Sequence, residues 1–182
     1  MPKKEVVPCT KEEMDAIIEA SMENDFCYTL FMVAKKTGRR LGEYYDVMVK
    51  DLDFERGIMM TKVLKKRKKA EKEAILDNEL IFLLKTHIRN NQLKLDDYLF
   101  RKIGYRQIQN KIAYYGKKAG VKHKVSFHNF RHYFVTELFK KGWTYDKIAK
   151  LTGHTSVSTL INYDHTVASD IREKAIEDIK DL

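Results

Sequence analysis

Proline occurs only at Pro2 and Pro8, so the chain from Cys9 onward lacks the residue that most strongly disrupts helices. Apolar residues recur at helical spacing over most of that length. The period changes after residues 51–53, where residues 58–64 have the composition of a strand and residues 73–76 could form the returning strand. The sequence therefore predicts a mainly α fold with a small antiparallel β-sheet.

Capping residues indicate where the helices begin and end. Thr10 and Glu13 form a capping-box pattern, and Asp77 and Thr144 precede other apolar segments. The predicted helices start at residue 11, cover 26–34, 41–48, 78–88, 105–118, 127 to near 142 and 145–151, and start again at 156 and 166. The aromatic residues expected to pack in the core are Phe130, Tyr133, Phe134, Phe139 and Trp143.

A length of 182 residues suits one domain, and 43% hydrophobic residues supply a core. The net charge of +9 and the pI near 9.4 favour a polyanionic partner, most often nucleic acid. Residues 65–69 are five consecutive basic residues at the predicted hairpin tip. Such a tip is usually just solvated, but it also suits contact with a phosphate backbone.

Cys9 and Cys27 are the only cysteines, and no Cys-x-x-Cys pair occurs. We expect reduced thiols in a cytoplasmic protein rather than a disulfide or a metal site. No apolar segment has the length of a membrane span, and residues 1–10 lack a signal-peptide core. His128 and His132 share the spacing of a zinc pair, but no third ligand is evident, so we expect no metal.

Four short motifs carry the functional signal. Arg40 stands in the sequence Thr-Gly-Arg-Arg-Leu-Gly-Glu, and Arg131 follows His128 by three residues. His154 ends the sequence Leu-Thr-Gly-His, and Tyr163 follows it by nine residues. Each motif alone is weak, but in this order and spacing they closely resemble the tyrosine recombinase (phage integrase) family. The resemblance extends over residues 11–182 and implies the DNA breaking-rejoining fold of the catalytic domain.

The resemblance implies a phosphoryl-transfer chemistry for the side chains of these motifs. Arg40 and Arg131 would hold the non-bridging oxygens of a DNA phosphate, and His154 would donate a further hydrogen bond. Tyr163 would attack the phosphorus, with His128 as the base, to give a 3′-phosphotyrosine and a free 5′-hydroxyl. This transesterification stores the energy of the broken bond, so neither a cofactor nor a metal is expected.

In the family a lysine on the β-hairpin protonates the departing 5′-oxygen. Extending both strands equally favours Lys66, whereas counting back from the returning strand favours Lys69. By similarity, Glu43 braces the active site rather than reacting. Arg39 adjoins Arg40, and only the motif distinguishes them.

The family also implies double-stranded DNA as partner, a tetramer on DNA and a nucleoid-associated location. Residues 1–10 are expected to be an arm or linker and residues 11–182 the catalytic domain, without the family's N-terminal domain. We therefore expect weak, salt-dependent DNA binding. The sequence does not indicate the target site, nor whether the role is integration, excision or multimer resolution.

Two other interpretations use some of the same residues. Residues 147–153 and 156–159 resemble a helix-turn-helix, which predicts a non-catalytic DNA-binding protein. That interpretation does not explain Arg40, His128 or Tyr163. A type IB topoisomerase would share the chemistry, but the Leu-Thr-Gly-His motif and the small size favour a recombinase.

Overall fold

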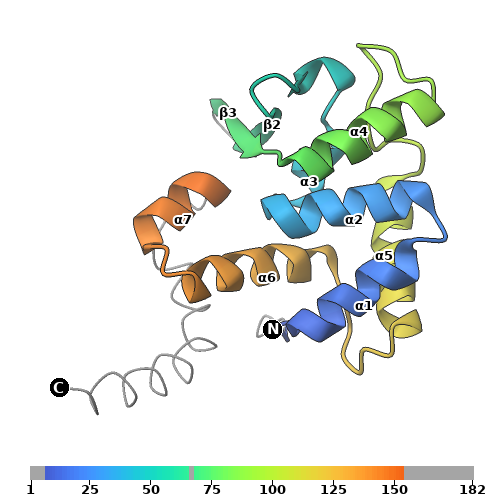
Figure 1. Ribbon diagram of the computed structural model, residues 1–182, viewed down its shortest axis with the longest axis vertical. Coiled ribbons are helices and arrows are strands. Elements are labelled where there is room, and N and C mark those ends of the chain that lie inside the picture. Colours follow the sequence, from blue (N-terminus) through green and yellow to red (C-terminus); the bar gives the residue numbers. More distant parts are fainter. Residues whose placement is uncertain (1–6, 66–67, 154–182) are drawn as a thin grey trace. The chain divides into compact units, whose positions relative to one another are not determined.

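The structure is a computed structural model that describes residues 7–65 and 68–153 (Figure 1). The chain forms two compact units, which divide within one helix between Tyr133 and Phe134. The first unit contains α1 (Lys11–Ser21), α2 (Asp25–Thr37), α3 (Leu41–Tyr45), the 3-10 helix η1 (Val49–Asp51), β1 (Leu52–Asp53), β2 (Ile58–Lys65), β3 (Lys68–Ile75), α4 (Asn78–Asn90), α5 (Tyr105–Lys118) and the first half of α6 (Phe127–Lys140). The second contains the rest of α6 and α7 (Tyr145–Thr152).

Helix α2 forms the centre of the first unit. Nine of its 13 residues are buried, and it packs against α1 and α4. Phe31 of this helix contacts the rings of Tyr115, Phe127 and Phe130, with centroids 5.4–6.4 Å apart. These aromatic contacts fix α5 and the start of α6 against α2, so the predicted core positions Phe130 and Tyr133 are confirmed.

The capping residues act as the sequence predicts at most helix ends. Thr10 and Glu13 form a complete capping box, and the Asp77 side chain accepts the hydrogen bond of the Leu80 backbone N–H. Gly38 and Gly153 end α2 and α7 with φ of 60° and 75°. Thr144 precedes α7 as expected, but its side chain forms no capping hydrogen bond.

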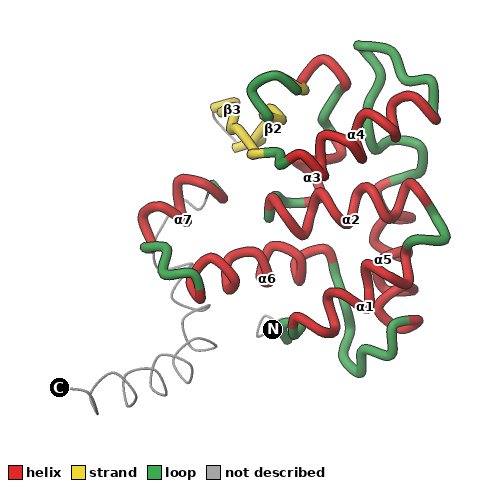
Figure 2. Tube along the Cα trace, in the orientation of Figure 1, coloured by secondary structure: helices red, strands yellow, loops and turns green. Residues whose placement is uncertain are grey.

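The small sheet has the order β1-β2-β3 and is antiparallel throughout. Figure 2 shows β2 and β3 in yellow. The hairpin pairs Ile58 with Ile75 at one end and Lys65 with Lys68 at the other. Its strands are longer than predicted, because the basic residues continue the ladder. The predicted mainly α fold with a small antiparallel sheet is therefore confirmed.

Three local expectations are wrong. The helix predicted over 41–48 ends at Tyr45, because Met48 leaves it to form a β-bridge with Tyr98. Leu76 follows β3 instead of ending it. Trp143 is 41% exposed rather than part of the core. The helices expected from residues 156 and 166 lie outside the described residues.

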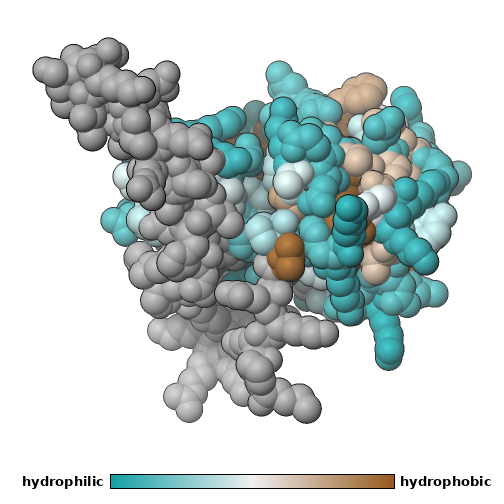
Figure 3. Space-filling view, turned by 90° about the horizontal axis from the view of Figure 1, so that it is seen from below, coloured by the Kyte–Doolittle hydropathy of each residue, from teal (hydrophilic) through white to brown (hydrophobic). Residues whose placement is uncertain are grey.

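The described surface is predominantly polar on the face shown in Figure 3, where teal side chains surround a few brown ones. No helix in the described part of the chain combines the length and apolar character needed to cross a membrane.

Candidate active site

The corner between α2 and α3 presents Arg40. Gly38 reverses the chain after α2, and Arg40 occupies the N-cap position of α3. The Arg40 backbone N–H donates to Glu43 Oε2 at 3.1 Å, and its Nη1 donates to Glu43 Oε1 at 3.3 Å. Glu43 is buried, whereas the Arg40 side chain is 49% exposed. One buried carboxylate thus holds both ends of an arginine that remains open to a ligand.

Arg131 reaches the same corner from α6. It is only 1% exposed, and its Nη1 donates to the carbonyl oxygen of Gly38 at 2.9 Å. Gly38 lies two residues before Arg40. The structure therefore brings together two arginines that are 91 positions apart in the numbering, at 40 and 131.

His128 lies one helical turn before Arg131 and is exposed at the helix surface. Loss of part of its hydration lowers its pKa, and the positive charges of Arg131 and Arg40 lower it further. The lowered pKa favours the neutral imidazole, which is the form that can accept a proton. This electrostatic coupling places His128 in the neighbourhood of both arginines.

Two neighbours of these residues are buried. Arg39 is not one of the motif residues. It is 1% exposed and donates a hydrogen bond to the carbonyl oxygen of Glu73 in β3. His132 is 8% exposed, and burial together with the nearby His128 lowers its pKa to about 4. The sequence did not predict a role for Arg39. Nothing in the local pattern distinguishes a buried arginine from an exposed one beside the motif arginine.

The remaining predicted site residues are described in part or not at all. Lys69 belongs to β3, where its backbone pairs with Leu64. Lys66, His154 and Tyr163 lie outside the described residues.

Possible metal ligands gather elsewhere, where Cys9, Glu13 and His123 place three donor atoms within 4.8 Å of one another. His123 Nε2 is 3.5 Å from Cys9 Sγ, while its Nδ1 is 3.9 Å from Glu13 Oε1. Glu13 also caps α1 through its other oxygen. Because different ring nitrogens face the thiol and the carboxylate, we interpret the group as a polar chain rather than as three ligands around one ion.

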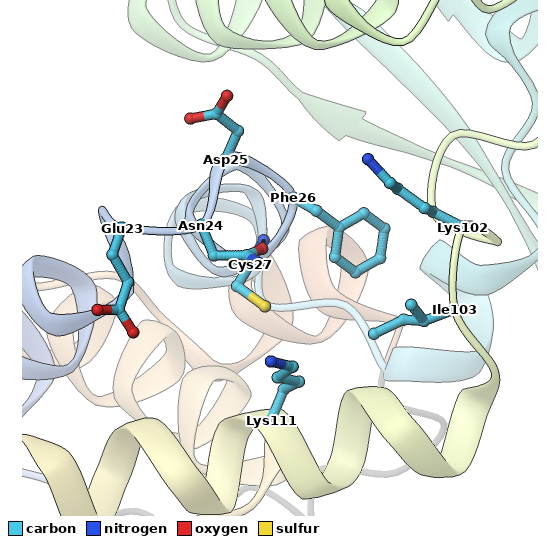
Figure 4. Close-up of a pocket in the computed structure, with 8 residues that line it drawn as sticks. All are labelled: Glu23, Asn24, Asp25, Phe26, Cys27, Lys102, Ile103 and Lys111. Atoms are coloured by element: carbon cyan, nitrogen blue, oxygen red, sulfur yellow. Dashed lines mark hydrogen bonds between the residues drawn. The ribbon is translucent and has the colours of Figure 1, made fainter.

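A pocket lies at the start of α2, whereas the arginine corner follows the end of this helix. Figure 4 shows the residues that line the pocket. Its lining comprises Glu23, Asn24, Asp25, Phe26, Cys27, Lys102, Ile103 and Lys111. Both charge signs occur in it, and burial raises the pKa of the Cys27 thiol to about 11. The pocket shares no residue with the corner that contains Arg40.

Known proteins with similar sequences include several tyrosine recombinases. The chain is 31% identical over 141 residues to the tyrosine recombinase XerA of Saccharolobus solfataricus, covering 78% of this chain and 46% of that protein. It is 27% identical to XerA of Pyrococcus furiosus, covering 95% of this chain and 62% of that protein. The chain thus spans about half the length of the curated relatives it matches.

Solved structures show the same fold. A crystal structure of XerA recombinase superposes with a TM-score of 0.81 at 28% identity, covering 97% of this chain and 65% of that one. A lambda integrase dimer bound to a COC′ core site shares the fold with a TM-score of 0.67 at 16% identity, covering 88% of this chain and 49% of that one. The model of the phage integrase family matches residues 9–169. The chain therefore belongs to the phage integrase family.

Proposed function

We propose that this chain is the catalytic domain of a site-specific DNA recombinase that cleaves and rejoins strands through a 3′-phosphotyrosine. The observation that carries the proposal is the bond from Arg131 to the carbonyl of Gly38 beside Arg40. It gathers two guanidinium groups at one corner, and the positive charges of both lower the pKa of the His128 imidazole. A phosphate that gains negative charge in the transition state needs such preorganised donors.

In the proposed reaction, Arg40 and Arg131 bind the non-bridging oxygens of the scissile phosphate, and His154 adds a further donor. The Tyr163 hydroxyl oxygen forms a bond to phosphorus while the bond from phosphorus to the 5′-oxygen breaks. His128 takes the phenolic proton, and Lys66 or Lys69 gives a proton to the departing oxygen. The ester retains the energy of the original bond, so a second 5′-hydroxyl can reverse the step without ATP.

Double-stranded DNA is the proposed partner, in keeping with the net charge of +9. We assign the catalytic domain to residues 11–182 and a connecting arm to residues 1–10. Strand exchange between two duplexes would require four such domains, which leads us to propose a tetramer on DNA.

Covalent trapping tests the proposal without knowledge of the target site. A pool of randomised duplexes with a nick just 3′ of the variable segment is incubated with the chain and then denatured. Cleavage near the nick releases a short strand that diffuses away, so the covalent complex accumulates. We expect adducts that survive denaturation, and their DNA identifies a cleavable sequence.

The matched control is Tyr163→Phe, which removes only the hydroxyl oxygen. It should bind the selected DNA as the unmodified chain does but form no adduct. Adducts in the Phe variant would reject Tyr163 as the nucleophile. Binding without any adduct in the unmodified chain would instead favour a non-catalytic DNA-binding protein.

A further inference from the structure

Arg39 connects the arginine corner to the β-hairpin. Its backbone N–H donates to the hydroxyl of Tyr44 at 2.7 Å, which fixes the start of the side chain. Its guanidinium donates through Nη2 to the carbonyl oxygen of Glu73 in β3. Arg39 therefore joins the corner between α2 and α3 to β3, although α3, η1, β1 and β2 separate them in the sequence.

A buried guanidinium with incomplete hydrogen bonding contributes little net stability to a fold. Arg39 is 1% exposed, and its Nε and Nη1 have no hydrogen-bond partner among the described residues. Burial lowers its pKa, an effect that the negative charge of Glu43 opposes. An apolar side chain of similar volume is often as stabilising as a buried charge of this kind. A requirement other than stability would explain an arginine at this position.

The bonded carbonyl lies on the outer edge of β3 in the described sheet. Leu76 N donates to Gly57 O, and hydrogen-bonded pairs alternate along an antiparallel ladder. The pair of Glu73 with Met60 is consequently a non-hydrogen-bonded pair, with the Glu73 carbonyl directed away from β2. Within the described part of the chain β3 is the last strand of the sheet, so there Arg39 supplies a donor that no neighbouring strand provides.

The same strand leads to the basic tip. Lys69 lies four residues before Glu73 in the same strand, β3. Lys66 lies just beyond the end of β2 at Lys65. A link that fixes the backbone of β3 at Glu73 therefore also fixes the strand that carries Lys69 relative to Arg40, the residue next to Arg39.

We propose that Arg39 is a positioning residue that fixes the lysine-bearing hairpin relative to the arginine corner. The inference rests on the proposed function, because it assigns the hairpin lysine the proton transfer to the 5′-oxygen. In this role Arg39 acts through β3 and contacts neither the phosphate nor the leaving group.

The test compares two leaving groups on the trapped DNA sequence. One substrate has the ordinary 5′-oxygen at the scissile phosphate, and the other has sulfur in its place. A thiolate leaves without a proton, because the pKa of a thiol is far below that of an alcohol. Loss of general-acid catalysis should therefore slow cleavage of the oxygen substrate only.

For Arg39→Met we expect adduct formation to fall by about tenfold or more with the oxygen substrate and to remain near the unmodified rate with the sulfur substrate. Lys66→Ala and Lys69→Ala serve as benchmarks, since the lysine that donates the proton should show the same pattern. Arg56→Met is the matched control. Arg56 contacts the Glu73 side chain at 3.6 Å instead of its carbonyl, and it is exposed, so both rates should be unchanged.

Thermal unfolding of each variant separates positioning from stability. If Arg39→Met does not fold, Arg39→Lys replaces it, because lysine retains the charge but not the planar guanidinium. Equal losses on both substrates would overturn the inference, since they indicate damage to Arg40 or to the fold. Unchanged rates on both would overturn it too. No adduct from the unmodified chain with either substrate would refute the proposed function itself, and the inference with it.

Discussion

The guanidinium of Arg131 donates a hydrogen bond of 2.9 Å to the carbonyl oxygen of Gly38, across 93 positions of sequence. Gly38 has a φ of 60°, a left-handed conformation that glycine adopts without strain. The turn directs its carbonyl toward α6 and positions Arg40 at the start of α3. The Arg131 side chain therefore stabilises the backbone of this corner and also contributes positive charge to it.

The two arginines should differ in their effect on stability. We expect Arg40→Gln and Arg131→Gln each to reduce adduct formation by about 10²–10³-fold, because each removes a preorganised donor. Arg40 is half exposed, so its replacement should leave the melting temperature nearly unchanged. Replacement of Arg131 leaves the Gly38 carbonyl without its donor and should lower the free energy of unfolding by about 1–3 kcal/mol.

Adduct kinetics and urea unfolding of both variants check this difference. An Arg131 variant that is as stable as the unmodified chain would contradict the structural role of its bond to Gly38.

We expect Glu43 to affect the rate of adduct formation by positioning Arg40. In Glu43→Gln the amide can still accept one hydrogen bond, but the negative charge that balances Arg39 and Arg40 is lost. We expect slower adduct formation and a free energy of unfolding lower by about 1–3 kcal/mol. Glu79→Gln is the control, because its exposed ion pair with Lys36 should contribute little. Equal adduct rates in Glu43→Gln and the unmodified chain would show that Arg40 does not need this carboxylate.

Gly116 of α5 is required by close packing rather than by backbone conformation. A Cβ atom there would lie 2.6 Å from Val125 Cγ2 and 2.7 Å from its Cβ. We expect Gly116→Ala to lower the free energy of unfolding by about 1–3 kcal/mol. Gly42→Ala in α3 meets no atom within 4 Å and should be neutral or stabilising by up to about 1 kcal/mol. Urea unfolding of the pair measures both, and equal stabilities would contradict the packing described.

His132 should make stability fall in mild acid. Its pKa is lowered from 6.5 to about 4 in the folded chain, so the unfolded chain binds more protons between these values. The free energy of unfolding should therefore decrease as the pH falls through 6.5 toward 4, with a contribution from His132 on the order of 3 kcal/mol. His132→Gln cannot titrate in this window. A variant with the same pH dependence as the unmodified chain would show that other groups cause the loss.

Local signals allowed much of the fold to be predicted. Thr10, Glu13, Asp77 and Gly38 mark helix ends through interactions with their own neighbours in sequence, and these predictions are confirmed. The early end of α3 depends on Met48 pairing with Tyr98, a contact between distant residues that local patterns do not encode. Tertiary contacts of this kind limit prediction from one sequence.

The candidate site, like the fold, was predicted from the sequence only in part. The motif selected Arg40 and Arg131, and the structure places both at one corner. The burial of Arg39 and its bond to Glu73 were not foreseen, because they depend on the edge of β3 approaching the corner. The structure describes neither His154 nor Tyr163, whose roles still rest on the resemblance to the family.

Identification of the residue attached to DNA tests the central claim most directly. The trapped adduct is digested with protease and nuclease, and the nucleotide-bearing peptide is sequenced by mass spectrometry. We predict a single modified residue, Tyr163, linked to the 3′-phosphate of the cleaved strand. A nucleotide on any other residue, or a link through a 5′-phosphate, would contradict the mechanism.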